Sequence, residues 1–80
     1  MTKKVVIYTT RYCPYCSAAK KLLQSKKVVY EEIDVTDDDA MREKLVQMSG
    51  GRETVPQIFI DGKSIGGYED LVRFLGAKPS

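Results

Sequence analysis

Histidine is absent from this 80-residue chain, and cysteine occurs only twice. A structural zinc site needs four ligands, which are usually cysteine or histidine, so one copy of the chain cannot supply such a site alone. Zinc could be bound only by cysteines shared between chains. We therefore expect no metal site within a single chain.

Long apolar segments are also absent. No basic stretch at the start is followed by the apolar run of about 7 to 15 residues that marks a secretory signal. No other run is long enough to span a bilayer. These absences predict a cytoplasmic protein without membrane contact. In that reducing compartment, a single pair of cysteines is more often catalytic than structural.

Positive charge is in small excess, because the chain has 13 Lys and Arg and 11 Asp and Glu. A net charge of +2 argues against a nucleic-acid-binding protein. The distribution is uneven, since residues 1–27 contain bases and no acid, whereas acids predominate in residues 28–54. Most simply, the helix lysines solvate an exposed face: Lys20, Lys21, Lys26 and Lys27. Arg11 could stabilise a thiolate and attract an anionic substrate, or it could be an ordinary surface charge.

The first part of the chain predicts a strand, a helix and a second strand. The continuous β-branched and aromatic run from Val5 to Tyr8 predicts a strand over residues 3–9, buried on both faces. Apolar residues at helical spacing predict a helix over residues 14–25: Ala19, Leu22 and Leu23. A second strand is predicted near residues 28–33. Two strands joined by a helix form a parallel pair with a right-handed connection.

Cys13 and Cys16 lie at the junction between the first strand and the helix. Pro14 suits the first helical position, where its missing N–H would be unpaired in any case. Free N–H groups and the helix dipole would then favour a thiolate at Cys13. Cys16 lies one turn further on the core side and should stay protonated until Cys13 has formed a mixed disulfide. The placement indicates a redox pair.

Two other uses of the cysteines remain open. A structural disulfide between Cys13 and Cys16 would close a very short loop, for which the entropic stabilisation is only about 2 kcal/mol. The cysteines could also serve as metal ligands shared between chains. The redox pair is the favoured interpretation.

The middle of the chain predicts a second helix. Thr36 is the expected N-cap, and Asp37 to Asp39 suit the first turn. The three aspartates could also form a cation site, but a helix start is favoured. Gly50 and Gly51 would end the helix. Its expected buried stripe consists of Met41, Leu45 and Met48.

The last third predicts a hairpin and a short helix. Residues 57–60 and 63–65 flank Asp61 and Gly62, a pair typical of a two-residue hairpin turn. A glycine pair opens the final helix, whose inner face is predicted from the apolar spacing: Gly66 and Gly67, then Leu71, Phe74 and Leu75. Residues 77–80 are expected to fray.

Three motifs, in order along the chain, resemble those of a glutaredoxin. They are Cys13-Pro14-Tyr15-Cys16, Thr54-Val55-Pro56 before a strand, and Gly66-Gly67-Tyr68-Glu69-Asp70-Leu71. The resemblance implies a thioredoxin-like α/β fold, with a four-stranded mixed sheet and three helices in the order β-α-β-α-β-β-α, formed by residues 1–80 as one domain. It also implies a glutathione-dependent thiol–disulfide oxidoreductase that reduces protein disulfides and glutathione mixed disulfides. Glutathione would be a co-substrate, with no permanently bound cofactor.

The resemblance also implies roles for individual residues. Cys13 would be the nucleophile and Cys16 the resolving thiol. A cis Pro56 would turn the main chain of Val55 towards the cysteines, to pair with the cysteinyl part of glutathione. The γ-glutamyl carboxylate would meet the N–H groups of Tyr68 and Glu69, with Asp70 near the ligand amine. The implied glutathione site comprises Tyr15, Arg42, Thr54, Val55, Pro56, Gly67, Tyr68, Glu69 and Asp70, with Arg11 and Pro14 in support.

Some positions in this set are open or depart from the family pattern. Arg42 would bind the glycine carboxylate of glutathione, or it could be an exposed helix charge. Many glutaredoxins have lysine where this chain has Thr10, and Glu53 places an acid where basic or small polar residues are common. If the turn at Gly67 needs a conformation that suits only glycine, a β-branched replacement there should weaken glutathione binding.

Two other functions compete with this one. In an iron–sulfur carrier, Cys13 of two chains and two glutathiones would hold a cluster, but Pro14 and Tyr15 argue against it. A glutaredoxin-like electron donor could instead be reduced by thioredoxin reductase, and the residues of glutathione type weigh against that: Thr54, Val55, Gly66, Gly67 and Asp70. The expected partners are glutathione and disulfide-containing or glutathionylated proteins, of which ribonucleotide reductase is one candidate. We expect a monomer.

Overall fold

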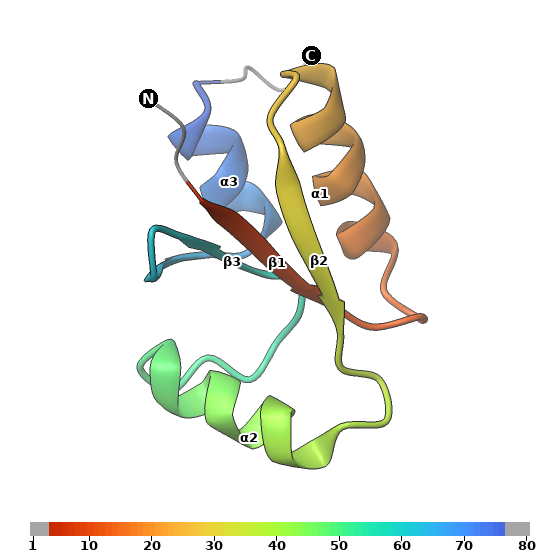
Figure 1. The fold of residues 1–80 in the computed structure, drawn as a ribbon, viewed down its shortest axis with the longest axis vertical. Coiled ribbons are helices and arrows are strands. Elements are labelled where there is room, and N and C mark those ends of the chain that lie inside the picture. The colour runs from red at the N-terminus through yellow and green to blue at the C-terminus, as the bar shows by residue number, and fades with distance from the viewer. Residues whose placement is uncertain (1–3, 77–80) are drawn as a thin grey trace.

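A four-stranded mixed sheet in the order β2-β1-β3-β4 forms the centre of the computed structural model, which describes residues 4–76 (Figure 1). The elements in chain order are β1 (Val5–Thr9), α1 (Pro14–Ser25), β2 (Tyr30–Asp34), α2 (Asp39–Met48), β3 (Gln57–Ile60), β4 (Lys63–Gly66) and α3 (Tyr68–Phe74). The predicted order of strands and helices is confirmed. Residue 3 of the first predicted strand and the predicted fraying at 77–80 lie outside the described residues, and one domain over residues 1–80 stays a prediction.

The strand pairing follows from the connections. β1 pairs with β2 in parallel, as predicted for strands joined through α1, and pairs with β3 antiparallel. β3 and β4 form the predicted hairpin. Its turn residues Asp61 and Gly62 have φ angles of 52° and 83°, which match the twist of a two-residue hairpin. The parallel pair therefore places the end of β1 directly before the start of α1.

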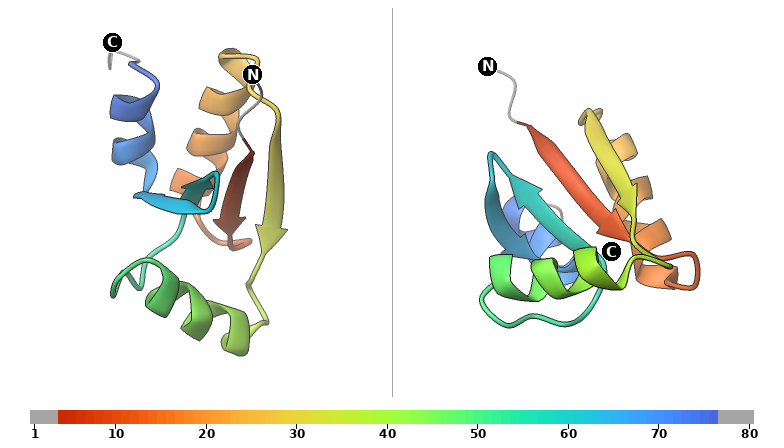
Figure 2. Two further views of the ribbon diagram at one scale, coloured as in Figure 1. Left: turned by 60° about the vertical axis from the view of Figure 1, so that its left-hand side comes forward. Right: turned by 60° about the horizontal axis from the view of Figure 1, so that its bottom comes forward.

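Helices cover the two faces of the sheet unequally. α1 and α3 lie together on one face, and α2 lies across the end of the other (Figures 1 and 2). The core beneath α1 and α3 contains Val5, Ile7, Ala19, Leu23, Ile58, Ile60 and Leu71, whereas the core beneath α2 contains Val35, Leu45 and Phe59. Val6 and Tyr8 are only partly buried against α2, so β1 is fully buried on one face alone. No helix within residues 4–76 combines the length and the apolar character needed to cross a bilayer.

Several local predictions were wrong in detail. Asp38, not Thr36, caps α2, because its carboxylate accepts the N–H of Met41 at 3.0 Å. Met48 and Phe74 were expected to be buried but are 44% and 47% exposed. Each lies three residues after the buried leucine of its helix, Leu45 or Leu71. Because successive residues are rotated by about 100° around a helix axis, this position points about 60° away from the buried leucine.

The second strand starts later than predicted. Val28 donates its N–H to the carbonyl of Leu23 at 2.9 Å and so closes the end of α1. Lys27 takes a positive φ of 57° at this reversal of the chain. β2 can therefore begin only at Tyr30.

Candidate active site

Cys13 is the N-cap residue of α1. It has extended backbone angles, Pro14 takes the first helical position, and the N–H of Cys16 points at the Cys13 sulfur with an N to Sγ distance of 3.2 Å. The Cys13 thiol donates in turn to the carbonyl oxygen of Val55 at 3.4 Å. Both cysteines are free thiols. A sulfur held at a helix start by a backbone N–H is well placed to carry negative charge.

Cys16 has the opposite surroundings. Only 2% of the residue is exposed, on the side of α1 that faces the sheet. Burial, and next a hydrogen bond with Cys13, raise the pKa of the Cys16 thiol to about 12. Cys16 is therefore protonated at neutral pH, and Cys13 is the more accessible of the two sulfurs.

A groove of about 380 Å³ begins beside the cysteines and runs to the start of α3. The peptide bond between Val55 and Pro56 is cis, as the family resemblance implied. The groove is lined by Tyr15, Arg52, Thr54, Val55, Pro56, Gly67, Tyr68, Glu69 and Asp70. Every residue in this lining except Arg52 belongs to the set that the resemblance implied.

Two predicted residues lie elsewhere. Arg42 is an exposed residue of α2 that does not line the groove. Arg11 forms an ion pair with Asp37, in the segment between β2 and α2. Arg52 was not predicted, although it directly precedes Glu53, whose charge next to Thr54 was noted. Its basic side chain two residues before the second motif was the available signal.

Asp70 organises the far end of the groove. Its Oδ2 atom accepts the N–H of Gly67 at 3.0 Å and lies 3.6 Å from Nη2 of Arg52, which reaches across from the opposite wall. Arg73 contacts the other carboxylate oxygen at 3.4 Å. Arg52 from the groove lining and Arg73 from α3 thus contact one carboxylate.

The glycine that this end requires is Gly66. Its φ is +112°, and a Cβ there would lie 2.2 Å from Oδ2 of Asp70. Gly67 has a φ of −98°, and a Cβ there would make an ordinary 3.4 Å contact with the carbonyl of Pro56. The expectation that Gly67 needs a glycine conformation was therefore wrong by one residue.

Comparison with known proteins decides the family. The glutaredoxin family model matches residues 5–65. The chain belongs to the glutaredoxin family. It is 52% identical to glutaredoxin 1 of Rickettsia prowazekii over 68 residues, which cover 84% of this chain and 72% of the relative. It is also 52% identical to glutaredoxin 3 of Escherichia coli over 67 residues, covering 84% of this chain and 80% of the relative.

Solved glutaredoxins share the fold. A buckwheat glutaredoxin–glutathione complex superposes with a TM-score of 0.84 and 34% identity, over 92% of this chain and 69% of that one. Glutaredoxin 1 from Francisella tularensis complexed with cacodylate superposes with a TM-score of 0.79 and 34% identity, over 94% of both chains. The predicted thioredoxin-like fold is confirmed. The activity of this glutaredoxin is glutathione-dependent thiol–disulfide exchange, and the two competing functions are not favoured.

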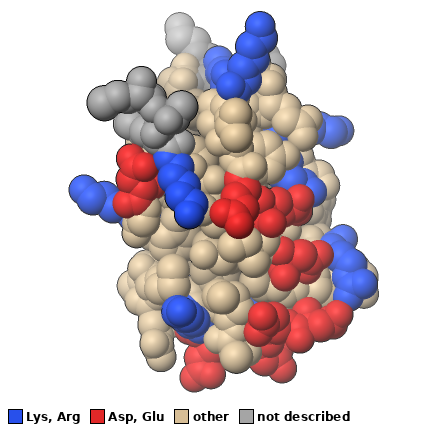
Figure 3. Space-filling view, viewed as in Figure 1, with Lys and Arg blue, Asp and Glu red and all other residues tan. Residues whose placement is uncertain are grey.

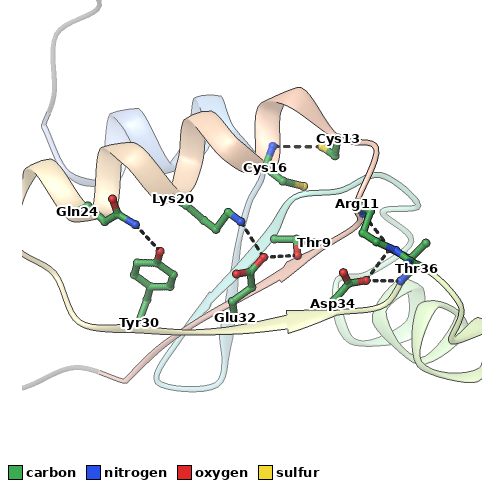
Figure 4. Close-up of polar contacts among 10 residues, drawn as sticks. All are labelled: Thr9, Arg11, Cys13, Cys16, Lys20, Gln24, Tyr30, Glu32, Asp34 and Thr36. Atoms are coloured by element: carbon green, nitrogen blue, oxygen red, sulfur yellow. Dashed lines mark hydrogen bonds and ion pairs between the residues drawn. The ribbon is translucent and has the colours of Figure 1, made fainter.

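A polar cluster lies between α1 and the sheet beneath the cysteines of this glutaredoxin (Figure 4). Oε2 of Glu32 accepts hydrogen bonds from Oγ1 of Thr9 at 2.8 Å and from Nζ of Lys20 at 3.0 Å. The bond from Lys20 lowers the pKa of Glu32, and Glu32 raises the pKa of Lys20, so both remain charged near neutral pH. Lys20 was predicted to lie on a solvated helix face, yet it pairs with Glu32. Its spacing of four residues from Cys16 was the available signal.

Proposed function

We propose that this glutaredoxin is a glutathione-disulfide oxidoreductase that reduces protein disulfides and glutathione mixed disulfides through Cys13 and Cys16. The observation that carries the proposal is the position of the Cys13 sulfur, between the N–H groups of α1 and the groove that starts at Val55. A nucleophilic sulfur at a helix start, next to an open groove, can meet a substrate disulfide held in that groove.

The proposed reaction is two successive thiol–disulfide exchanges. The Cys13 thiolate attacks one sulfur of the substrate, forms a mixed disulfide, and releases the other sulfur as a thiolate that takes up a proton. Cys16 then loses its proton and attacks Cys13, which releases the reduced substrate. One glutathione thiolate opens the Cys13–Cys16 disulfide, and a second one releases glutathione disulfide and restores Cys13. Two electrons pass from two glutathiones to the substrate.

We propose that glutathione binds along the groove. The main chain of Val55 would pair with its cysteinyl part, with Thr54 and Pro56 on one wall and Tyr15 on the other. Asp70 would bind the amine, and the N–H groups of Tyr68 and Glu69 would bind the neighbouring carboxylate. The solved buckwheat relative is a glutaredoxin–glutathione complex, which supports glutathione as the ligand.

Arg52 takes the place that the sequence analysis gave to Arg42 as the cation of this groove. Arg52 is in the lining, whereas Arg42 is not. Its pairing with Asp70 places the guanidinium where a ligand carboxylate can reach it. We also propose that the protein acts as a monomer in the cytoplasm, on protein partners such as ribonucleotide reductase.

The charge of the surface around the site is uneven. Figure 3 shows acidic side chains gathered over β2 and around α2, and few bases among them. Asp37 is an exposed acid that pairs with Arg11. Within the groove lining, Arg52 supplies the positive side chain that can attract an anionic ligand.

A coupled NADPH assay tests the proposed reductant. The protein is assayed with a glutathionylated peptide, once with glutathione and glutathione reductase and once with thioredoxin reductase alone. We expect turnover only in the glutathione system. Equal or faster turnover with thioredoxin reductase would overturn the proposal.

A further inference from the structure

We propose that Thr9, Glu32 and Lys20 form a device that holds the Lys20 ammonium beside Cys16, where it stabilises the thiolate that resolves a mixed disulfide. Lys20 is then a positioning residue for the second exchange step and has no part in the first. The inference rests on the proposed dithiol function.

The geometry places Lys20 and Cys16 on one face of α1. They are four residues apart, so both side chains leave the helix in the same direction. Figure 4 shows the Cys16 sulfur and the Lys20 chain directed into the same space between α1 and the sheet, above Thr9 and Glu32. The spacing and the view together bring the ammonium to the side of α1 on which Cys16 is buried.

Lys20 is fixed there from the sheet side. A lysine near a surface normally extends its ammonium into water. Here Nζ is 3.0 Å from Oε2 of Glu32, and the same oxygen is 2.8 Å from Oγ1 of Thr9, a residue that is 1% exposed. The buried hydroxyl orients the carboxylate, and the carboxylate orients the ammonium.

The Lys20 ammonium can assist the step in which Cys16 attacks the mixed disulfide at Cys13. Burial opposes the ionisation of Cys16, and Cys16 must ionise to attack Cys13. The backbone of Thr10 and, to a smaller extent, the charge of Lys20 act in the opposite direction and lower the pKa of Cys16. When Cys16 attacks, its proton passes to water, a bond forms between the two cysteine sulfurs, and the substrate sulfur leaves with the electron pair and takes up a proton.

Other titratable groups around Cys16 are already engaged. Cys13 at the start of α1 is the partner sulfur itself. On β2, the hydroxyl of Tyr30 accepts a hydrogen bond from Gln24, and Asp34 is bound by Thr36. On α3, the ring of Tyr68 packs against that of Tyr15. Lys20 is the cation that acts on Cys16 in the described structure.

The test follows resolution in a single turnover. Reduced protein is mixed with glutathione disulfide, and release of the second glutathione is timed as the Cys13–Cys16 disulfide forms, at a series of pH values. For Lys20→Gln we expect release at pH 7 to slow by about 3- to 10-fold and its pH profile to move up by about 0.5 to 1 unit. Lys20→Arg should restore most of the rate. The matched control, Lys21→Gln, changes the neighbouring exposed lysine and should behave as wild type.

A second arm separates this role from a structural one. In a Cys16→Ser background, Lys20→Gln should leave deglutathionylation of a peptide unchanged, because no resolving thiolate forms. An equal loss in both backgrounds, or a slower release without movement of the pH profile, would overturn the proposal. Failure of the parent function would look different, since the wild-type protein itself would then not react with glutathione disulfide.

Discussion

The two ends of the groove are built for different tasks. At the cysteine end, one sulfur meets a backbone N–H and a backbone carbonyl, and the nearby charges of Arg11 and Asp37 neutralise each other. At the far end, Asp70 binds a backbone N–H and two arginines. A neutral, open end suits a sulfur that must exchange partners, whereas a charged end suits recognition. Changes at the cysteine end should therefore affect rate, and changes at the Asp70 end should affect affinity.

The largest effect should come from the nucleophile. Cys13→Ser should lose more than about a thousandfold in both deglutathionylation and protein disulfide reduction, because no other accessible sulfur can attack. Cys16→Ser should keep deglutathionylation and lose most protein disulfide reduction, since only a thiol held within one turn resolves a mixed disulfide quickly. Both activities are measured for each variant. A Cys13→Ser protein that still reduces glutathione mixed disulfides near the wild-type rate would contradict this assignment.

The alkylation rate of Cys16 should also change strongly when the protein unfolds. Burial is the largest cause of the raised pKa of Cys16 and persists when Cys13 is replaced, so alkylation of Cys16 at pH 8.5 in the native Cys13→Ser protein should be more than about tenfold slower than after unfolding. Rates measured by mass spectrometry, with and without denaturant, check this. Similar rates in the two states would show that Cys16 is not protected by the fold.

A glycine exchange tests the far end. Gly66→Ala combines a positive φ with a Cβ 2.2 Å from Oδ2 of Asp70, so it should cost about 1 to 3 kcal/mol of unfolding free energy and displace the carboxylate. Glutathione affinity should fall with it. Gly67→Ala is the matched control and should change either quantity far less, because its Cβ meets only an ordinary contact. Chemical denaturation and calorimetric titration measure the two effects, and equal effects of the two variants would refute the distinction.

Asp70→Asn should give the smallest of these effects, confined to affinity. Removing the charge from a carboxylate that is one third exposed should raise the KM for glutathione about 5- to 30-fold. The kcat should change little, because Asp70 is distant from the sulfurs along the groove. A loss in kcat with an unchanged KM would mean that the division between the two ends is wrong.

The sequence could predict the elements of the fold because each carries a local signal. Apolar periodicity identified α1, and the Asp61–Gly62 pair identified the hairpin. Thr36 was misassigned because a tertiary contact decides its use. Its hydroxyl accepts the N–H of Arg11 at 2.8 Å and its own N–H binds Asp34, which leaves the capping position to Asp38.

The parts of the site that depend on tertiary contacts were harder to predict. The cysteine motif, the residues around Val55 and those around Asp70 are three separate segments, and each of them is a short motif that the sequence shows directly. The fold brings the three together. Arg52 reaches the groove because its carbonyl is held by the side chain of Gln57 at 2.8 Å, a contact that no local pattern indicates. Likewise, the pairing of Lys20 with Glu32 depends on β2 lying beside β1 beneath α1.

The paired rings of Tyr15 and Tyr68 give this glutaredoxin an optical consequence. Their centroids are 6.1 Å apart, and both residues line the groove. The chain has 5 tyrosines and no tryptophan, so no indole emission masks the weaker phenol signal. Occupation of the groove should therefore change the ultraviolet fluorescence of the unlabelled protein, and tyrosine emission should report ligand exchange at Cys13 without a label.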